Sequence, residues 1–139
     1  MHELNIIHRD IKIENILTQD FSKDTKIRIA DLGSSIRLNS PDEKVNFKIG
    51  TPGYIAPEIL KGEPYSFAVD VWSLGCLLHV LLCATPPFWD DERSIRNKKV
   101  CEEQLDLESN QFLCSLSDSC KSLLHLMLCK DPKKRPTIR

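Results

Sequence analysis

Hydrophobic and polar residues alternate over two short segments in the first third of the chain. Residues 15–18 read NILT and residues 26–30 read KIRIA, with a polar, turn-like stretch between them. Alternation on both sides of a turn predicts a small antiparallel pair of strands. Residues 33–48 are polar and show no period, which predicts a long loop, and long ordered loops usually carry function.

The second half of the chain has the apolar spacing of helices. Ser117 is a candidate N-cap, because a serine side chain can accept a hydrogen bond from the first free amides of a helix. The apolar residues that follow it recur with a helical period, which predicts that they share one face of the helix. These residues are Leu123, Leu124, Met127 and Leu128. Further helices are expected over residues 56–60, 66–83 and 92–103.

One stretch, residues 71–89, contains no charged residue and has the length of a membrane span. It also carries Ser73, His79 and the pair Pro86-Pro87, and Asp70 directly precedes it. A wholly buried helix in a protein core has the same pattern. We therefore expect a core helix here and no membrane partner.

Composition describes an ordinary globular chain. It has 139 residues, of which 41% are hydrophobic and 28% charged, and its formal net charge is −1. That charge balance gives no general attraction to nucleic acid, so no nucleic-acid partner is expected. The start of the chain has no positively charged segment followed by an apolar one, which argues against a signal peptide.

The chain has six cysteines and no C-x-x-C pair. Reduced, mostly buried thiols are therefore expected, as in intracellular proteins. Cys76, His79 and Cys83 fall on one helical face and could suggest a metal site. The residues between them are apolar and supply no further ligand, so core packing is the favoured interpretation.

The charged run HRDIKIEN, residues 8–15, concentrates the chemistry of the chain. Asp10 can accept a hydroxyl proton, Lys12 can neutralise charge on a phosphoryl group, and Asn15 offers an amide oxygen to Mg²⁺. The strand KIRIA ends at Asp31, where Gly33 lets the chain turn sharply, and this carboxylate is a second hard donor. A base, a lysine and two oxygen donors make up the catalytic half of a phosphoryl-transfer site.

These residues resemble the signature of protein kinases. His8-Arg9-Asp10 with Lys12 and Asn15 is similar to the catalytic loop, and Asp31-Leu32-Gly33 resembles the D-F-G triplet. Three further segments resemble the family in the same order. They are GTPGY at 50–54 with APE at 56–58, DVWSLG at 70–75, and Arg135 in DPKKRPT.

The resemblance implies a mainly α fold with a small β hairpin, the C-terminal (large) lobe of a kinase. It implies ATP and Mg²⁺ as cofactors, with a protein serine or threonine as the phosphate acceptor. Asp10 and Lys12 would be catalytic, and Thr51 would position the substrate beside them. The remaining assignments follow the same alignment of motifs. Lys12, Glu14, Asn15 and Asp31 would bind the cofactor, Asn15 and Asp31 the metal, and His8, Arg9, Gly33, Glu58, Asp70 and Arg135 would be structural.

Several residues depart from the family pattern. Leu32 replaces the usual phenylalanine of the triplet, and Ile13 replaces the usual proline after Lys12. Phe47 stands where many kinases carry an activating phosphate, so Arg9 would lack that partner. PPFWDDE, residues 86–92, resembles the calcium/calmodulin-dependent kinases, and Glu14 resembles an acidic residue that selects basic substrates.

The chain has no glycine-rich loop and no V-A-I-K-like strand, since its glycines are at 33, 50, 53, 62 and 75. We therefore expect residues 1–139 to be a partial kinase domain, truncated at both ends, that lacks the N-terminal lobe as its partner. Alone it should be inactive, in a cytoplasmic or nuclear protein. The alternatives are a non-catalytic interaction module and a small-molecule phosphotransferase, although the latter typically has H-G-D in place of HRD.

Overall fold

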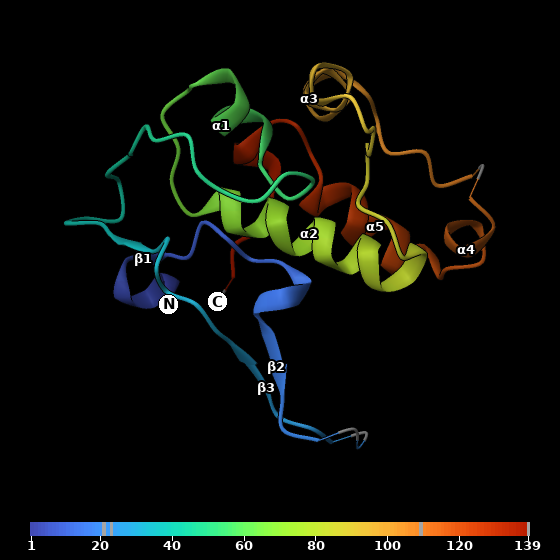
Figure 1. The fold of residues 1–139 in the computed structure, drawn as a ribbon, viewed down its shortest axis with the longest axis horizontal. Helices are drawn as coiled ribbons and strands as arrows, with labels where there is room; N and C mark the ends of the chain where they lie inside the picture. The colour runs from blue at the N-terminus through green and yellow to red at the C-terminus, as the bar shows by residue number, and fades with distance from the viewer. Residues whose placement is uncertain (21, 23, 109, 139) are drawn as a thin grey trace.

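The computed structural model describes residues 1–20, 22, 24–108 and 110–138. Its regular structure is mainly helical, with two very small sheets (Figure 1). The α-helices are α1 (Pro57–Lys61), α2 (Ala68–Cys83), α3 (Arg93–Glu102), α4 (Gln111–Cys114) and α5 (Asp118–Met127). The strands are β1 (Ile6–Ile7), β2 (Ile16–Thr18), β3 (Ile27–Ile29) and β4 (Ile36–Arg37). Short 3-10 turns are η1 (His2–Leu4), η2 (Ile13–Asn15) and η3 (Pro132–Lys134).

Strands β2 and β3 form the antiparallel hairpin that the alternating pattern predicts. Ile16 pairs with Ile29, and Thr18 pairs with Ile27. The hairpin projects away from the helices (Figure 1). Residues 33–48 are predicted to be a loop without regular structure. The second sheet contradicts this, because Ile36 in that segment belongs to β4 and pairs with Ile7 in β1. Strands of two residues are too short for alternation to reveal them.

Helix α2 is the centre of the fold and packs against α5 and α4 (Figure 1). It begins two residues later than the apolar pattern suggests, and Ala84 ends it in a left-handed conformation with φ of 59°. At Gly75 the helix approaches α5 so closely that an added Cβ would lie 2.9 Å from the Leu128 side chain. Trp72 is fully buried on the same helix.

The ends of the shorter helices follow local capping chemistry. Helix α1 has Pro57 at its first position and Gly62 just beyond its end, with φ of 73°. Ser117 caps α5 as predicted, and its side chain accepts a hydrogen bond from the Cys120 amide. The predicted apolar face of α5 is only partly covered, because Leu123 is 44% exposed whereas Leu124 is fully buried.

The cysteine–histidine face of α2 belongs to the core. Cys76, His79 and Cys83 are buried, and the His79 Nδ1 lies 2.7 Å from the Thr85 carbonyl oxygen. Burial raises the pKa of Cys83 and lowers the pKa of His79. Across the described residues, no helix has both the length and the apolar character needed to cross a bilayer.

Candidate active site

Asp70, in the first turn of α2, holds the loop before η2 in place. Its carboxylate accepts hydrogen bonds from the backbone amides of His8 and Arg9, each at 2.8 Å. The His2 Nε2 lies 2.9 Å from the same carboxylate. Asp70 is 1% exposed, so its carboxylate has little contact with water. These partners provide the hydrogen bonds that water would make to an exposed carboxylate.

His8 links this loop to the end of β3. Its Nδ1 lies 3.3 Å from the Asp10 amide and its Nε2 lies 3.1 Å from the Ala30 carbonyl. Because an amide only donates and a carbonyl only accepts, the ring carries its proton on Nε2. His8 is fully buried and has both nitrogens occupied, so it acts on the position of its neighbours rather than on a ligand.

Asp10, Lys12 and Thr51 form a closed triangle of polar side chains. The Thr51 hydroxyl donates to one Asp10 carboxylate oxygen at 2.6 Å, and Lys12 Nζ lies 3.0 Å from the other. Lys12 also donates to the Thr51 hydroxyl at 2.9 Å. Gly50, with φ of 119°, permits this approach, because a Cβ there would lie 3.3 Å from the Arg9 carbonyl oxygen.

This triangle sets the charge of both ionisable groups. Burial alone would raise the pKa of Asp10, but the hydrogen bonds from Thr51 and Lys12 outweigh it and hold that pKa below its usual range. The hydrogen bond to Asp10 raises the pKa of Lys12. The negative charges of Glu14 and Asp31 raise this pKa further. An ionised carboxylate that already orients one hydroxyl can accept a proton from another.

Asn15 and Asp31 both lie at the base of the hairpin, just before the start of β2 and after the end of β3. The Ala30 amide donates to the Asn15 carbonyl at 2.8 Å, so Asp31 directly follows the residue paired with Asn15. The Asn15 side-chain NH2 group donates to the Asp10 carbonyl at 2.8 Å. The side-chain oxygen of Asn15 is then available as a metal ligand. Asp31 has φ of 62° and accepts from the Gly33 amide at 3.1 Å.

These oxygens are hard donors that suit Mg²⁺. Among the described residues, no group of three or more His, Cys, Asp and Glu side chains is arranged to hold a metal. A cation between Asn15 and Asp31 would therefore need further oxygens from phosphate and water, which is the usual situation for Mg²⁺. Glu14 lies in η2 next to this pair and is exposed.

Arg9 contacts the segment that leads to Thr51, where Phe47 stands in place of a residue that could be phosphorylated. Its Nε donates to the Ser34 carbonyl at 2.6 Å, and its guanidinium lies 5.9 Å from the centre of the Phe47 ring. Tyr65 adds to this contact, because its hydroxyl donates to the Phe47 carbonyl at 3.0 Å. The sequence predicts that Arg9 lacks a phosphate as its partner. The Phe47 ring takes that place, and its cation–π attraction to Arg9 replaces part of the attraction that a phosphate would provide.

Glu58, in helix α1, forms a buried ion pair with Arg135. The guanidinium donates to both carboxylate oxygens, at 2.6 and 2.8 Å. It also donates to the carbonyls of Cys129 and Ala68 at 2.8 and 2.9 Å. The pair joins helix α1 to the residues after α5.

Three contributors to the site carry no signal in the sequence. His2, Ser34 and Tyr65 bind Asp70 or Arg9 from positions 25 to 68 residues away. Each is an ordinary residue type in a segment without a period. Only the fold brings them to the catalytic loop.

Comparison with known proteins gives a consistent result. Residues 1–139 match the protein kinase domain family. The chain is 40% identical to calcium-dependent protein kinase 28 of Oryza sativa subsp. japonica over 136 residues, covering 98% of this chain and 25% of that protein. It is 38% identical to two Caenorhabditis elegans proteins over 98% and 99% of its length. These are calcium/calmodulin-dependent protein kinase type II, of which it covers 19%, and type 1, of which it covers 38%.

Proposed function

Because the chain belongs to the protein kinase family, we propose that the whole protein transfers the γ-phosphoryl group of ATP to a serine or threonine hydroxyl of another protein. The chain spans between about a fifth and two fifths of the length of the curated relatives described above. Its own site geometry therefore has to support the proposal. The Asp10–Lys12–Thr51 triangle is the observation that carries it.

In this proposal Asp10 orients the acceptor hydroxyl and takes its proton. The lowered pKa of Asp10 keeps the carboxylate ionised at neutral pH, as a proton acceptor requires. Lys12 reaches both Asp10 and Thr51, so its ammonium is fixed where negative charge develops on the transferred group. Thr51 and the Asp70 contacts hold this geometry before substrate arrives.

Asn15 and Asp31 would hold the magnesium ion that accompanies ATP, with Lys12 and Glu14 beside the phosphates. Bound Mg²⁺–ATP supplies the phosphoryl group and neutralises its charge. The residues of this chain contribute fixed oxygen donors for it. Two features fix them: the hydrogen bond from the Asn15 side-chain amide to Asp10, and the turn from Asp31 to Gly33.

Specificity for serine and threonine is supported by the Lys12–Thr51 contact. It fills the space beside Asp10 with a lysine stem and a small hydroxyl residue. In this proposal the acceptor is the short side chain of a serine or threonine, which meets Asp10 beside this pair. The lowered pKa of Asp10 also suits an aliphatic hydroxyl, which needs a positioned base to lose its proton in the transition state.

We assign these residues to the large, C-terminal lobe of the kinase fold. The catalytic loop, the hairpin and the helices around α2 are the parts of a kinase that lie below the nucleotide, and no glycine-rich loop occurs among the 139 residues. Apolar side chains are exposed on the hairpin and beside Asp31, where a covering lobe would dock. They are Leu17, Ile27, Ile29 and Leu32, exposed by 43% to 66%.

The proposal includes an intracellular setting, because all six cysteines are free. The exposed acidic side chain of Glu14 beside the site suits a substrate with basic residues near the acceptor.

The test is phosphate transfer from radiolabelled ATP with Mg²⁺, measured on the complete protein that carries this chain. Asp10→Asn should reduce kcat by at least about 100-fold, because it removes the base and keeps the shape. The exposed Asp42→Asn is the matched control and should retain full activity. The 139 residues alone should show negligible turnover, since positioning of the nucleotide supplies much of the rate. Unchanged kcat in Asp10→Asn would refute the proposal.

A further inference from the structure

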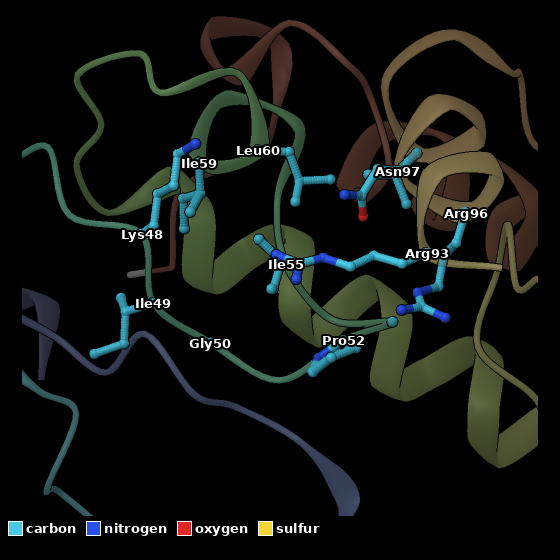
Figure 2. A pocket seen from close by; sticks show the side chains of 12 residues that line it. Lys48, Ile49, Gly50, Pro52, Ile55, Ile59, Leu60, Arg93, Arg96 and Asn97 are labelled. Atoms are coloured by element: carbon cyan, nitrogen blue, oxygen red, sulfur yellow. The ribbon is translucent and has the colours of Figure 1, made fainter. Parts of the chain in front are cut away.

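A cavity of about 340 Å³ lies between the segment around Gly50, helix α1 and helix α3 (Figure 2). Its apolar wall comes from residues of all three segments. These are Ile49, Pro52, Ile55, Ile59, Leu60 and Val100. The cavity has the size of one or two amino-acid side chains and is separate from the Asn15–Asp31 pair.

The charged residues that line this cavity are all cationic. They are Lys48, Arg93 and Arg96, and no aspartate or glutamate lines it. In a chain whose net charge is −1, such a local excess of positive charge is not explained by composition. A cavity with like charges and low-dielectric walls attracts an anion.

Arg96 is held in place while the other two cations are free. Arg96 is 9% exposed, donates to the Asp90 carbonyl at 2.7 Å and lies 4.8 Å from the Trp89 ring centre. Within the described part of the chain, the side chains of Lys48 and Arg93 make neither a hydrogen bond nor an ion pair. Figure 2 shows the Arg93 side chain extending across the cavity toward Ile55, with Lys48 on the opposite side.

The acidic side chains on the α3 side of the cavity form their contacts with residues other than Lys48 and Arg93. The Asp90 carboxylate lies 3.1 Å from Lys99 Nζ, which is outside the cavity. The hydroxyl of Ser94 donates to the Glu92 carboxylate. Lys48 and Arg93 therefore keep their full capacity to bind a carboxylate.

The cavity adjoins the proposed acceptor position. Gly50 and Pro52, which line it, are the two neighbours of Thr51, and the Thr51 hydroxyl contacts Asp10. An extended peptide advances about 3.3 Å per residue. A residue within a few positions of the acceptor hydroxyl can therefore place its side chain in the cavity.

We propose that this cavity selects protein substrates that carry a glutamate or aspartate close to the accepting serine or threonine. The carboxylate lies between Lys48 and Arg93, and its aliphatic stem lies against Ile55 and Pro52. This inference rests on the proposed function and names the class of substrate that the same site accepts.

The experiment compares serine peptides in which glutamate, glutamine, lysine or phosphoserine occupies each position on either side of the acceptor. Phosphate transfer by the complete protein gives kcat/KM, and fluorescence anisotropy gives the Kd of the same peptides. At one position, glutamate should improve both values about fivefold over glutamine. High salt should reduce this preference, because the cations are exposed.

The double variant Lys48→Gln with Arg93→Gln should bring the glutamate-to-glutamine ratio close to one. Both side chains are exposed and unpaired, so the variant should fold normally. Lys98→Gln is the control, since it removes one positive charge from an exposed position of α3 that does not line the cavity. This control should keep the full preference.

The outcomes separate the inference from the proposed function. Transfer without a glutamate preference at any position, or a preference that the double variant keeps, would overturn the inference alone. A preference for phosphoserine without one for glutamate would also overturn it. Glutamate-selective binding that the double variant removes, without any phosphate transfer, would support the cavity and refute the kinase activity.

Discussion

Arg135 and Glu58 form a bidentate ion pair across 77 positions of sequence, and both side chains are almost completely buried. The pair connects α1 with the segment after α5, on either side of α2. Breaking such a pair leaves one charge in the core without a partner, which costs more than the pair itself contributes.

Glu58→Gln should therefore lower the free energy of unfolding by about 3–5 kcal/mol. Urea denaturation followed by circular dichroism measures this value. Glu108→Gln is the control, because Glu108 lies 3.8 Å from Lys121 with its side chain 83% exposed, and an exposed pair contributes little. Equal effects from the two substitutions would show that the buried pair does not stabilise the fold.

Asp70→Asn should loosen the catalytic loop. An asparagine keeps one accepting oxygen, but its amide group then faces a backbone N–H that has no acceptor. We expect a loss of about 2 kcal/mol in unfolding free energy. Hydrogen exchange should accelerate at the amides of His8 and Arg9. Unchanged protection at these two amides would show that Asp70 does not hold the loop.

Thr51→Val should raise the pKa of Asp10 toward its ordinary value, because it removes the hydroxyl that stabilises the carboxylate. Carboxyl NMR titration measures this directly. A lowered pKa in the folded state adds stability that is lost as the pH falls through that pKa. The stability difference between wild type and Thr51→Val should therefore be largest at neutral pH and shrink in acid. Thr51→Ser, which keeps the hydroxyl, should behave like the wild type.

The side-chain ammonium of Lys130 is buried, which makes its positive charge unfavourable. Its Nζ has no hydrogen-bond partner among the described residues and lies 3.6 Å from the Phe88 ring centre. Burial lowers the pKa of Lys130 from 10.5 to about 8. The two facing rings, Phe88 and Trp72, compensate only part of the lost hydration.

Lys130→Met should consequently stabilise the protein at pH 7, by roughly 1 kcal/mol after allowance for partial exposure. Between pH 8 and 10.5 the unfolded chain binds the Lys130 proton and the folded chain does not, so rising pH favours the folded state of the wild type. The advantage of Lys130→Met should shrink across this window in thermal denaturation. The exposed Lys134→Met should produce no such pH-dependent difference.

The sequence predicts the residues of the candidate site better than their surroundings. Asp10, Lys12 and Asn15 lie within a few residues of one another, so a single loop places them. The hairpin register then carries Asp31 to the same end. Strands β1 and β4 and the contacts of His2 and Tyr65 could not be predicted, because each depends on two short segments that only tertiary packing brings together.

Helix boundaries show the same division. The Ser117 cap was predictable because its chemistry is local, whereas the exposure of Leu123 was not. A helical period identifies apolar positions, but the neighbouring elements decide which of them are covered. Helix α4 is too short for any period to be detected.

The projecting hairpin has a practical consequence for anyone who purifies these residues by themselves. Among the residues that the structure describes, β2 and β3 pair only with each other, and Leu17, Ile27 and Ile29 are open to solvent. Unpaired strand edges that carry exposed apolar side chains favour self-association. Light scattering should therefore detect aggregates whose size grows with protein concentration. Replacing Ile27 with a charged residue should keep the protein monodisperse.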